Sequence, residues 1–182
     1  MQRGALAGIF PVDHITLDYV SKRISRLGKN HSRYNYQQFE KLSNSVMEAD
    51  EGAEYYQVIE FDLSTVEPFI SGPNSVKKMQ RLLDLERQKI KVDKAYLVSC
   101  VNSRASDIKA AAKVLKDKKV ASHVEFYVAA ASSEVERDAK TSGDWQILLN
   151  AGAKPLISGC GPCIGNTNFI KYRTWCWSFE RW

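Results

Sequence analysis

The chain has 182 residues, of which 44% are hydrophobic and 26% are charged, and its formal net charge is +5. This composition is that of an ordinary globular protein, and the length suits one domain with some peripheral structure. No apolar run approaches the roughly 20 residues of a membrane-spanning helix, and the N-terminus lacks the pattern of a secretory signal. Lys and Arg are spread among acidic residues rather than clustered. We therefore expect a soluble protein with no membrane or nucleic-acid partner.

The first segment, residues 1–52, is predicted to be helical. Asp13 can cap a helix whose apolar residues continue at helical spacing to Ile24, and a second helix fits Tyr36 to Met47. The polar and basic stretch between them suits an exposed connection.

The next segment changes in character. Residues 55–63, YYQVIEFDL, are rich in aromatic and β-branched side chains, which predicts a strand. Turn-forming residues at 67–73 predict a loop, and apolar residues at roughly helical spacing predict a helix from Asn74 to Arg87.

Residues 93–158 alternate between strand and helix patterns. The predicted strands are KAYLVSC (94–100), VEFYVAAA (124–131) and KPLI (154–157), with helices at 106–117 and within 132–150 between them. This order is typical of a parallel sheet with right-handed crossovers. The predicted fold class is α/β: a three-layer parallel sheet with flanking helices over residues 53–165, preceded by the helical segment 1–52.

Three of the four cysteines lie where a parallel sheet places its ligands. Cys100 closes the first predicted strand of the alternating region, and Cys160 and Cys163 follow the last. Ligands of such sheets bind beyond the carboxyl ends of the strands. The separation of about sixty residues between the first thiol and the other two is therefore compatible with their convergence at one edge.

Several chemistries fit these cysteines. Cys160-Gly-Pro-Cys163 is the tetrapeptide of thioredoxin-type dithiols, but the following IGNTNF does not predict the long helix that such a site needs. Structural zinc prefers four ligands in two close pairs, and Cys100 has no near partner. An iron–sulfur cluster held by three thiolates leaves one iron open for Lewis-acid chemistry. Inert buried thiols are a fourth reading. Spacing alone does not choose between them, and four cysteines do not make a disulfide framework, so we expect a reducing compartment.

The flanking residues add a family resemblance. YLVSCVNSRASD (96–107) and GCGPCIGN (159–166) resemble the cluster-binding signature pair of the aconitase superfamily. Its members reversibly dehydrate and rehydrate hydroxy di- and tricarboxylic acids. The resemblance implies that Cys100, Cys160 and Cys163 are the metal ligands of a [4Fe-4S] cluster, whose fourth iron binds the substrate. It assigns no catalytic acid or base to this chain, because those groups belong to regions outside it, as do the substrate-binding arginines.

Further stretches favour one branch of that superfamily. RGALAGIFPVD (3–13), SRASDIKAAAKV (103–114) and AAASSEVERDAKTSGDWQILLNAGA (129–153) are most similar to fungal homoaconitases. This implies a fragment, inactive alone, of a mitochondrial hydro-lyase that hydrates cis-homoaconitate to homoisocitrate in lysine biosynthesis. It also implies a small hydroxy tricarboxylic acid as substrate and a monomeric enzyme. Aconitase and the large subunit of 3-isopropylmalate dehydratase are alternatives within the superfamily, and a thioredoxin-like oxidoreductase is the alternative from another class.

The last segment, residues 166–182, departs from the family pattern. After Gly165 the family continues with Gly-x-Gly-Leu-Leu-x-x-Gly, whereas this chain has Trp175, Trp177 and Trp182 at the spacing of those glycines. A tryptophan codon read one base forward always encodes glycine. We interpret the segment as an aberrant tail, produced by a retained intron and a shifted frame, in which Cys176 has no function. An aromatic tail that anchors a partner is the alternative, but nothing amphipathic precedes it.

Overall fold

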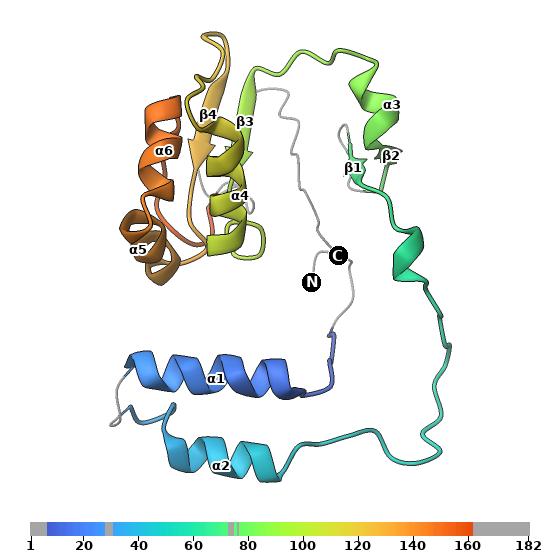
Figure 1. The fold of residues 1–182 in the computed structure, drawn as a ribbon. Coiled ribbons are helices and arrows are strands. Elements are labelled where there is room, and N and C mark those ends of the chain that lie inside the picture. The colour runs from blue at the N-terminus through green and yellow to red at the C-terminus, as the bar shows by residue number, and fades with distance from the viewer. Residues whose placement is uncertain (1–6, 28–30, 73–74, 76, 162–182) are drawn as a thin grey trace. The chain divides into compact units, whose positions relative to one another are not determined.

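The computed structural model describes residues 7–27, 31–72, 75 and 77–161 (Figure 1). The chain divides into two compact units, residues 1–60 and 61–182. No helix within the described ranges combines the length and the apolar character needed to cross a membrane.

The first unit is a pair of helices, α1 (His14–Leu27) and α2 (Tyr36–Asn44). α1 begins as predicted, because the Asp13 carboxylate accepts a hydrogen bond from the Thr16 backbone N–H at 2.8 Å. Ile24 is buried, and the hydroxyls of Ser25 and Tyr36 lie 3.2 Å apart between the helices. Both predicted helices are confirmed. α2 ends before Met47 because Ser45 bonds back to the carbonyls of the last turn, its N–H to Leu42 and its hydroxyl to Lys41.

The predicted strand at 55–63 is wrong. Residues 55–61 contain no regular structure, and a single 3-10 turn, η1, covers Leu63–Thr65. Tyr56 is fully exposed, and Ile59 and Phe61 are largely exposed. A strand needs a neighbour to receive its backbone hydrogen bonds, and no described strand pairs with this segment. The composition of this segment therefore reflects a high β propensity, but that propensity alone does not produce a strand.

A small hairpin replaces the loop expected at 67–73 and half of the helix expected at 74–87. β1 (Phe69–Ser71) pairs antiparallel with β2 (Met79–Arg81), with Ile70 opposite Gln80. Gly72, at φ +121°, donates its N–H to the Lys78 carbonyl at 2.8 Å and so continues the pairing into the connection. Helix α3 then covers only Leu82–Glu86.

The order of strands and helices in the alternating region is as predicted, although each strand is shorter than its predicted range. Its elements are β3 (Lys94–Leu97), α4 (Ala105–Leu115), β4 (Glu125–Val128), α5 (Ser133–Thr141), α6 (Asp144–Ala151) and β5 (Lys154–Pro155). The strands form a parallel sheet in the order β3-β4-β5, of which β3 and β4 are labelled side by side in Figure 1. Leu97 pairs with Val128, and Val128 with Pro155. The α/β fold class with a parallel sheet and flanking helices is confirmed.

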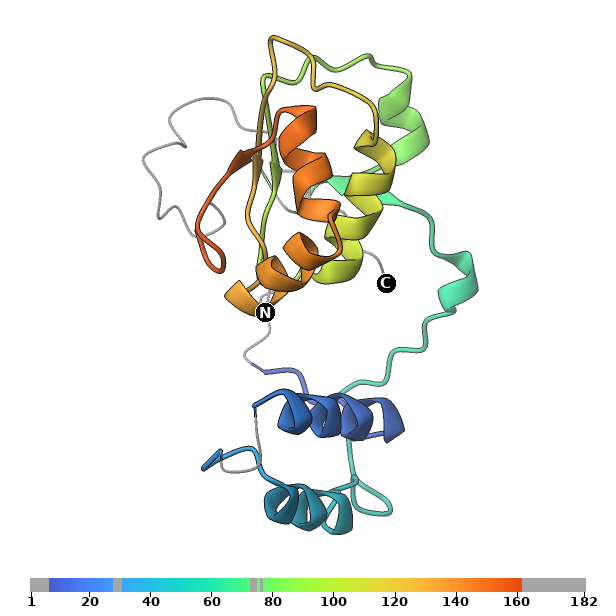
Figure 2. The same ribbon diagram turned by 60° about the vertical axis from the view of Figure 1, so that its left-hand side comes forward.

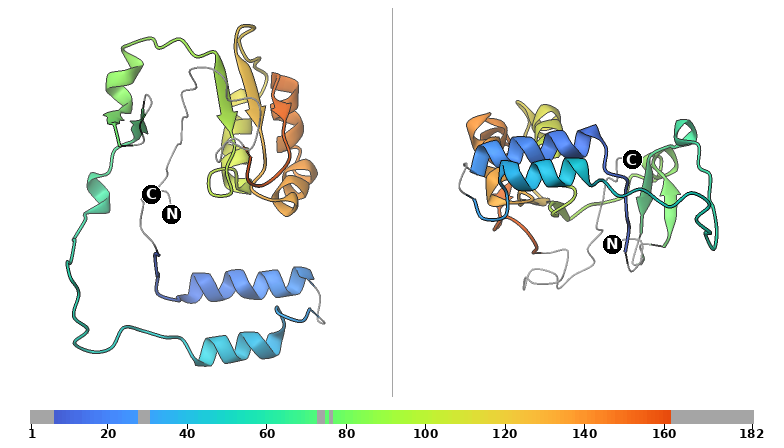
Figure 3. Two further views of the ribbon diagram at one scale, coloured as in Figure 1. Left: turned by 180° about the vertical axis from the view of Figure 1, so that it is seen from behind. Right: turned by 90° about the horizontal axis from the view of Figure 1, so that it is seen from below.

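The core lies between this sheet and its helices. α4, α5 and α6 contact one another, and α4 and α6 lie on one face of the strands (Figures 2 and 3). Alternate strand residues point toward them, and the helices meet these with the apolar residues of their inner faces. The buried set is Ile108, Ala112, Phe126, Val128, Ala130, Ala139, Trp145, Leu148 and Ala153. Because both strand ends and helix starts are fixed by this packing, the loops between them are held in place.

The other face of the sheet carries a polar and aromatic cluster. The rings of Tyr96 and Tyr127 stack with centroids 5.2 Å apart. The Tyr127 hydroxyl donates a hydrogen bond to Glu125, whose carboxylate also pairs with Lys94 and Lys154 at 3.6 and 3.1 Å. These donors and cations lower the pKa of Glu125 to about 2, the Tyr127 hydrogen bond having the largest effect. The same hydrogen bond raises the pKa of Tyr127 to about 12.

Candidate functional site

The first cysteine loop follows β3. The strand ends at Leu97, so Cys100 lies beyond it rather than closing it as predicted. Ser99 adopts φ +120°, a rare conformation for a residue with a side chain, and it is buried. Its hydroxyl accepts hydrogen bonds from the N–H groups of Val101 and Asn102 at 3.0 and 3.4 Å. This tight turn leaves the Cys100 thiol exposed.

The end of the same loop starts helix α4. The Asp107 carboxylate accepts a hydrogen bond from the Arg104 N–H at 3.1 Å, which satisfies one of the free donors at the helix start. Ser103 is completely buried, and within the described ranges its hydroxyl has no hydrogen-bond partner. The loop is thus fixed at both ends, by β3 and by the start of α4.

The second cysteine loop follows β5. Residues 156–161 run from the strand to Cys160, whose thiol is also exposed. Gly159 adopts φ +104°, which a glycine tolerates and other residues rarely do. This turn orients the peptide that leads directly into Cys160.

Both loops are hydrogen-bonded to one segment, residues 128–131, at the end of β4. On one side, Ala129 and Ala131 donate their N–H groups to the carbonyls of Leu97 and Ser103 at 3.0 and 2.9 Å. On the other side, the carbonyls of residues 128 and 130 accept from the N–H groups of Leu156 and Gly159 at 2.8 and 2.9 Å. Cys100 and Cys160 therefore follow the carboxyl ends of the two strands that flank β4. This is the edge at which the sequence places the site.

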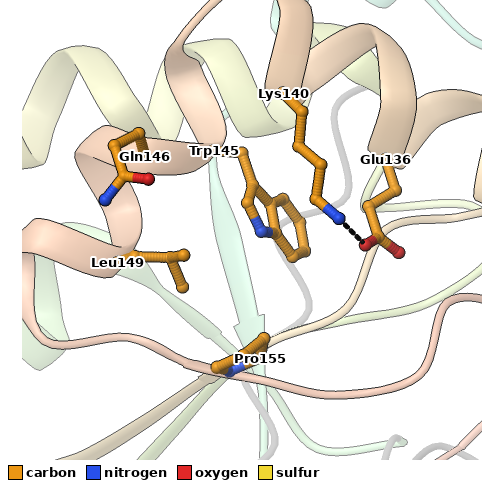
Figure 4. Close-up of a pocket in the computed structure, with 6 residues that line it drawn as sticks. All are labelled: Glu136, Lys140, Trp145, Gln146, Leu149 and Pro155. Atoms are coloured by element: carbon orange, nitrogen blue, oxygen red, sulfur yellow. Dashed lines mark hydrogen bonds and ion pairs between the residues drawn. The ribbon is translucent and has the colours of Figure 1, made fainter.

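A side-chain contact ties the second loop to helix α5. The Ser158 hydroxyl donates a hydrogen bond to the Glu136 carboxylate, which also pairs with Lys140 at 2.6 Å. These two donors, Lys140 first, lower the pKa of Glu136. Figure 4 shows the Glu136–Lys140 pair beside the Trp145 ring, on the wall of a cavity of about 410 Å³ that Pro155 also lines. The polar contact therefore lies at the margin of the core, next to the loop that carries Cys160.

The third expected ligand, Cys163, lies outside the described residues, as do Cys176 and the whole segment 166–182. Among the residues that the structure does describe, no three His, Cys, Asp or Glu side chains gather into a metal site. Sequence reasoning missed the supporting groups Ser99, Glu136 and Ser158. The spacing of Glu136 and Lys140 is visible as a helical pair, but the contact of Glu136 with Ser158 spans 22 residues and requires the fold.

The fold and the two loops define a class of protein: an α/β domain that presents cysteines from neighbouring strands at the carboxyl edge of a parallel sheet. A model of the aconitase family (aconitate hydratase) matches residues 2–179. The chain belongs to the aconitase family.

Curated relatives are similar over most of the chain. It is 57% identical over 162 residues to a protein of Yarrowia lipolytica named "Homoaconitase, mitochondrial", a match covering 89% of this chain and 23% of that protein. A protein of the same name from Candida albicans is 53% identical over 170 residues, covering 92% of this chain and 25% of that protein. The corresponding Neurospora crassa protein is 47% identical, with coverages of 89% and 23%. The chain thus spans about a quarter of the length of these relatives.

Proposed function

We propose that this chain is part of a homoaconitase, a mitochondrial hydro-lyase that reversibly hydrates cis-homoaconitate to homoisocitrate in lysine biosynthesis. The names of the fungal relatives support this reaction and this compartment. The observation that carries the proposal is the attachment of both cysteine loops to residues 128–131, which brings Cys100 and Cys160 to one edge of the sheet. The substrate is a small hydroxy tricarboxylic acid, and the enzyme acts as a monomer.

The aconitase family generally binds a [4Fe-4S] cluster, and the described part of the site fits one. Two exposed thiols on loops that are hydrogen-bonded to the end of β4 are the soft donors that iron–sulfur clusters require. We propose that Cys100, Cys160 and Cys163 are the three ligands. When bound, the cluster would supply Lewis-acid chemistry toward a substrate hydroxyl.

The surrounding residues hold those thiols in place. Ser99 orients the turn at Cys100 by accepting two backbone N–H groups, so that thiol needs little reordering when it binds metal. Gly159 restricts the turn before Cys160, because its backbone N–H donates a hydrogen bond to the carbonyl of residue 130. Neither loop supplies a group placed to transfer a proton to substrate, and we assign no acid or base within the described residues.

The alternative enzymes of the superfamily, aconitase and the large subunit of 3-isopropylmalate dehydratase, are not favoured, because the relatives at 47–57% identity are named homoaconitases. A thioredoxin-like dithiol is disfavoured by membership in the aconitase family. That alternative makes a distinct prediction: Cys160 and Cys163 would form a reversible disulfide without any contribution from Cys100.

The test is anaerobic reconstitution of the 182-residue chain with ferrous iron and sulfide. We expect cluster absorbance and bound iron, and we expect Cys100→Ser to retain roughly a tenth of that iron or less, because a missing thiolate leaves an iron without its ligand. Cys176→Ser is the matched control and should bind iron as the unaltered chain does. If Cys100→Ser bound iron normally, or if no chain bound iron, the assignment of the ligands would be wrong.

A further inference from the structure

The loop that carries Cys160 is held on two sides by different kinds of contact. On the sheet side its attachments are the two backbone hydrogen bonds to residues 128 and 130. On the helix side the contact is the hydrogen bond from the Ser158 hydroxyl to the Glu136 carboxylate. Because Ser158 lies two residues before Cys160, a change in this contact acts on the peptide that presents the thiol.

The Glu136 carboxylate is well placed to serve as a fixed anchor. It lies in the first turn of α5, and its side chain is only 26% exposed. Lys140, one turn further along the same helix, holds it with an ion pair of 2.6 Å. One of its oxygens accepts from Lys140 and the other from Ser158, so the two partners do not compete. A hydrogen bond to a charged acceptor is also stronger than one between neutral groups.

The backbone at Gly159 makes this anchor effective. Its φ of +104° turns the chain sharply between Ser158 and Cys160, while its N–H is bonded to residue 130. That bond holds the Ser158–Gly159 peptide from the sheet side. The Ser158 hydrogen bond holds the residue before this peptide to helix α5, so the turn that precedes Cys160 is attached on both sides.

We propose that Glu136 is a positioning residue for the metal site: through Ser158 it fixes the turn that orients the Cys160 thiol toward the cluster. This inference rests on the proposed function, since it concerns how one of the three proposed ligands is held. It assigns a role to α5, which contributes no ligand itself. Lys140 supports that role by keeping the carboxylate in place.

The experiment uses four variants of the 182-residue chain: Ser158→Ala, Glu136→Ala, the double variant of these two, and Glu136→Gln. Ser133→Ala, an exposed serine on the same helix, is the matched control. The first measurement is the rate at which a chelator removes iron from the reconstituted chain. The second, made on metal-free protein, is the rate at which iodoacetamide alkylates Cys160, followed by peptide mass spectrometry.

We expect each alanine variant to lose iron roughly three- to tenfold faster, which is less than one charge-assisted hydrogen bond is worth because this contact acts on the ligand only indirectly. The double variant should be no faster than either single variant, because both remove the same contact. Alkylation of Cys160 should change in these variants while that of Cys100 does not. Glu136→Gln keeps an oxygen acceptor for Ser158 but loses the charge and the Lys140 ion pair, so it should fall between Glu136→Ala and the unaltered chain. Ser133→Ala should match the unaltered chain.

Iron loss and Cys160 alkylation within twofold of the unaltered chain in both alanine variants would overturn the proposal. The proposal would also be wrong if the effects of the two substitutions on iron loss multiplied in the double variant, or if Glu136→Gln behaved like Glu136→Ala. A chain that binds no iron at all contradicts the proposed function instead, and the alkylation measurement still decides whether Glu136 positions Cys160. A merely structural role for Glu136 would lower the melting temperature and alter the alkylation of Cys100 and Cys160 alike.

Discussion

Tyr127 and Glu125 form a hydrogen bond on the face of the sheet opposite α4 and α6, and it links stability to pH. The pKa of Glu125 falls from 4.5 to about 2 in the folded chain, so its contribution to stability is present above pH 4.5 and is lost as pH falls toward 2. The pKa of Tyr127 rises from 10.0 to about 12, so its contribution is present below pH 10 and is lost as pH rises through 12. The hydrogen bond therefore contributes its full stabilisation between pH 4.5 and pH 10.

Tyr127→Phe should accordingly be less stable than the unaltered chain at neutral pH, because it leaves the Glu125 carboxylate without its hydroxyl donor. The difference in the free energy of unfolding should shrink as pH falls from 4.5 toward 2, where Glu125 becomes protonated in both proteins. Urea unfolding followed by circular dichroism at several pH values measures this.

Tyr96→Phe is the matched control for that measurement. Its ring stacks on the Tyr127 ring, but in the part of the chain that the structure describes its buried hydroxyl has no hydrogen-bond partner. Removing that hydroxyl should cost nothing and should leave the pH dependence unchanged. A Tyr127→Phe deficit that stayed constant from pH 7 to pH 2 would show that lost packing, not the carboxylate, causes it.

The residues of the candidate site differ in how readily the sequence identifies them. Cys100 and Cys160 stand in short motifs whose glycines and spacing suggest chemistry before any fold is known. Ser99 and Ser158 are ordinary serines in loops. The role of Ser99 depends on its positive φ, and that of Ser158 depends on its contact with Glu136, which lies 22 residues away in the chain. Ligands are thus visible locally, whereas the groups that orient them become visible only through tertiary contacts.

At the scale of elements, helix α4 connects the Cys100 loop to the core. Ile108 is fully buried against the sheet and α6, whereas Val114 on the same helix is 63% exposed. Ile108→Ala should lower the free energy of unfolding by about 2–5 kcal/mol, since it removes buried methyl groups and leaves a cavity. Val114→Ala should change it by less than about 0.5 kcal/mol.

Chemical denaturation of both variants tests this, with the unaltered chain as reference. Equal losses for Ile108→Ala and Val114→Ala would mean that the packing of α4 on the sheet is not the source of its stability. Because α4 starts at Ala105, at the end of the loop that carries Cys100, the Ile108 variant should also bind iron less tightly after reconstitution, while the Val114 variant should not.

Elements that bury an apolar face in one core were predictable, whereas very short elements and segments without a pairing neighbour were not. The helices and parallel strands of 93–158 follow from periodicity, since each buries one face in a single core. The hairpin of β1 and β2 escaped prediction because its strands have only three residues each and the Leu82–Glu86 helix begins directly after them. Residues 55–63 have the composition of a strand, but composition does not supply a neighbour to pair with.

At the scale of the whole molecule, residues 166–182 raise a question that coding DNA can answer. Reading each tryptophan codon one base forward gives glycine whatever follows, so the three glycines alone prove nothing. The family pattern also requires Leu-Leu after the second glycine, at the place of Ser178 and Phe179. In the shifted frame these two codons become leucine only if Ser178 is encoded by TCT and Phe179 by TTT.

We therefore predict the codons TCT and TTT at these two positions in the coding DNA. Serine has six codons and phenylalanine two, so an unrelated aromatic tail would meet both conditions only about once in twelve if codons were used equally. Sequencing genomic DNA and transcripts across this segment measures it directly. Any other serine codon at position 178 would remove the family pattern from the shifted frame and leave Trp175, Trp177 and Trp182 as residues of a genuine tail.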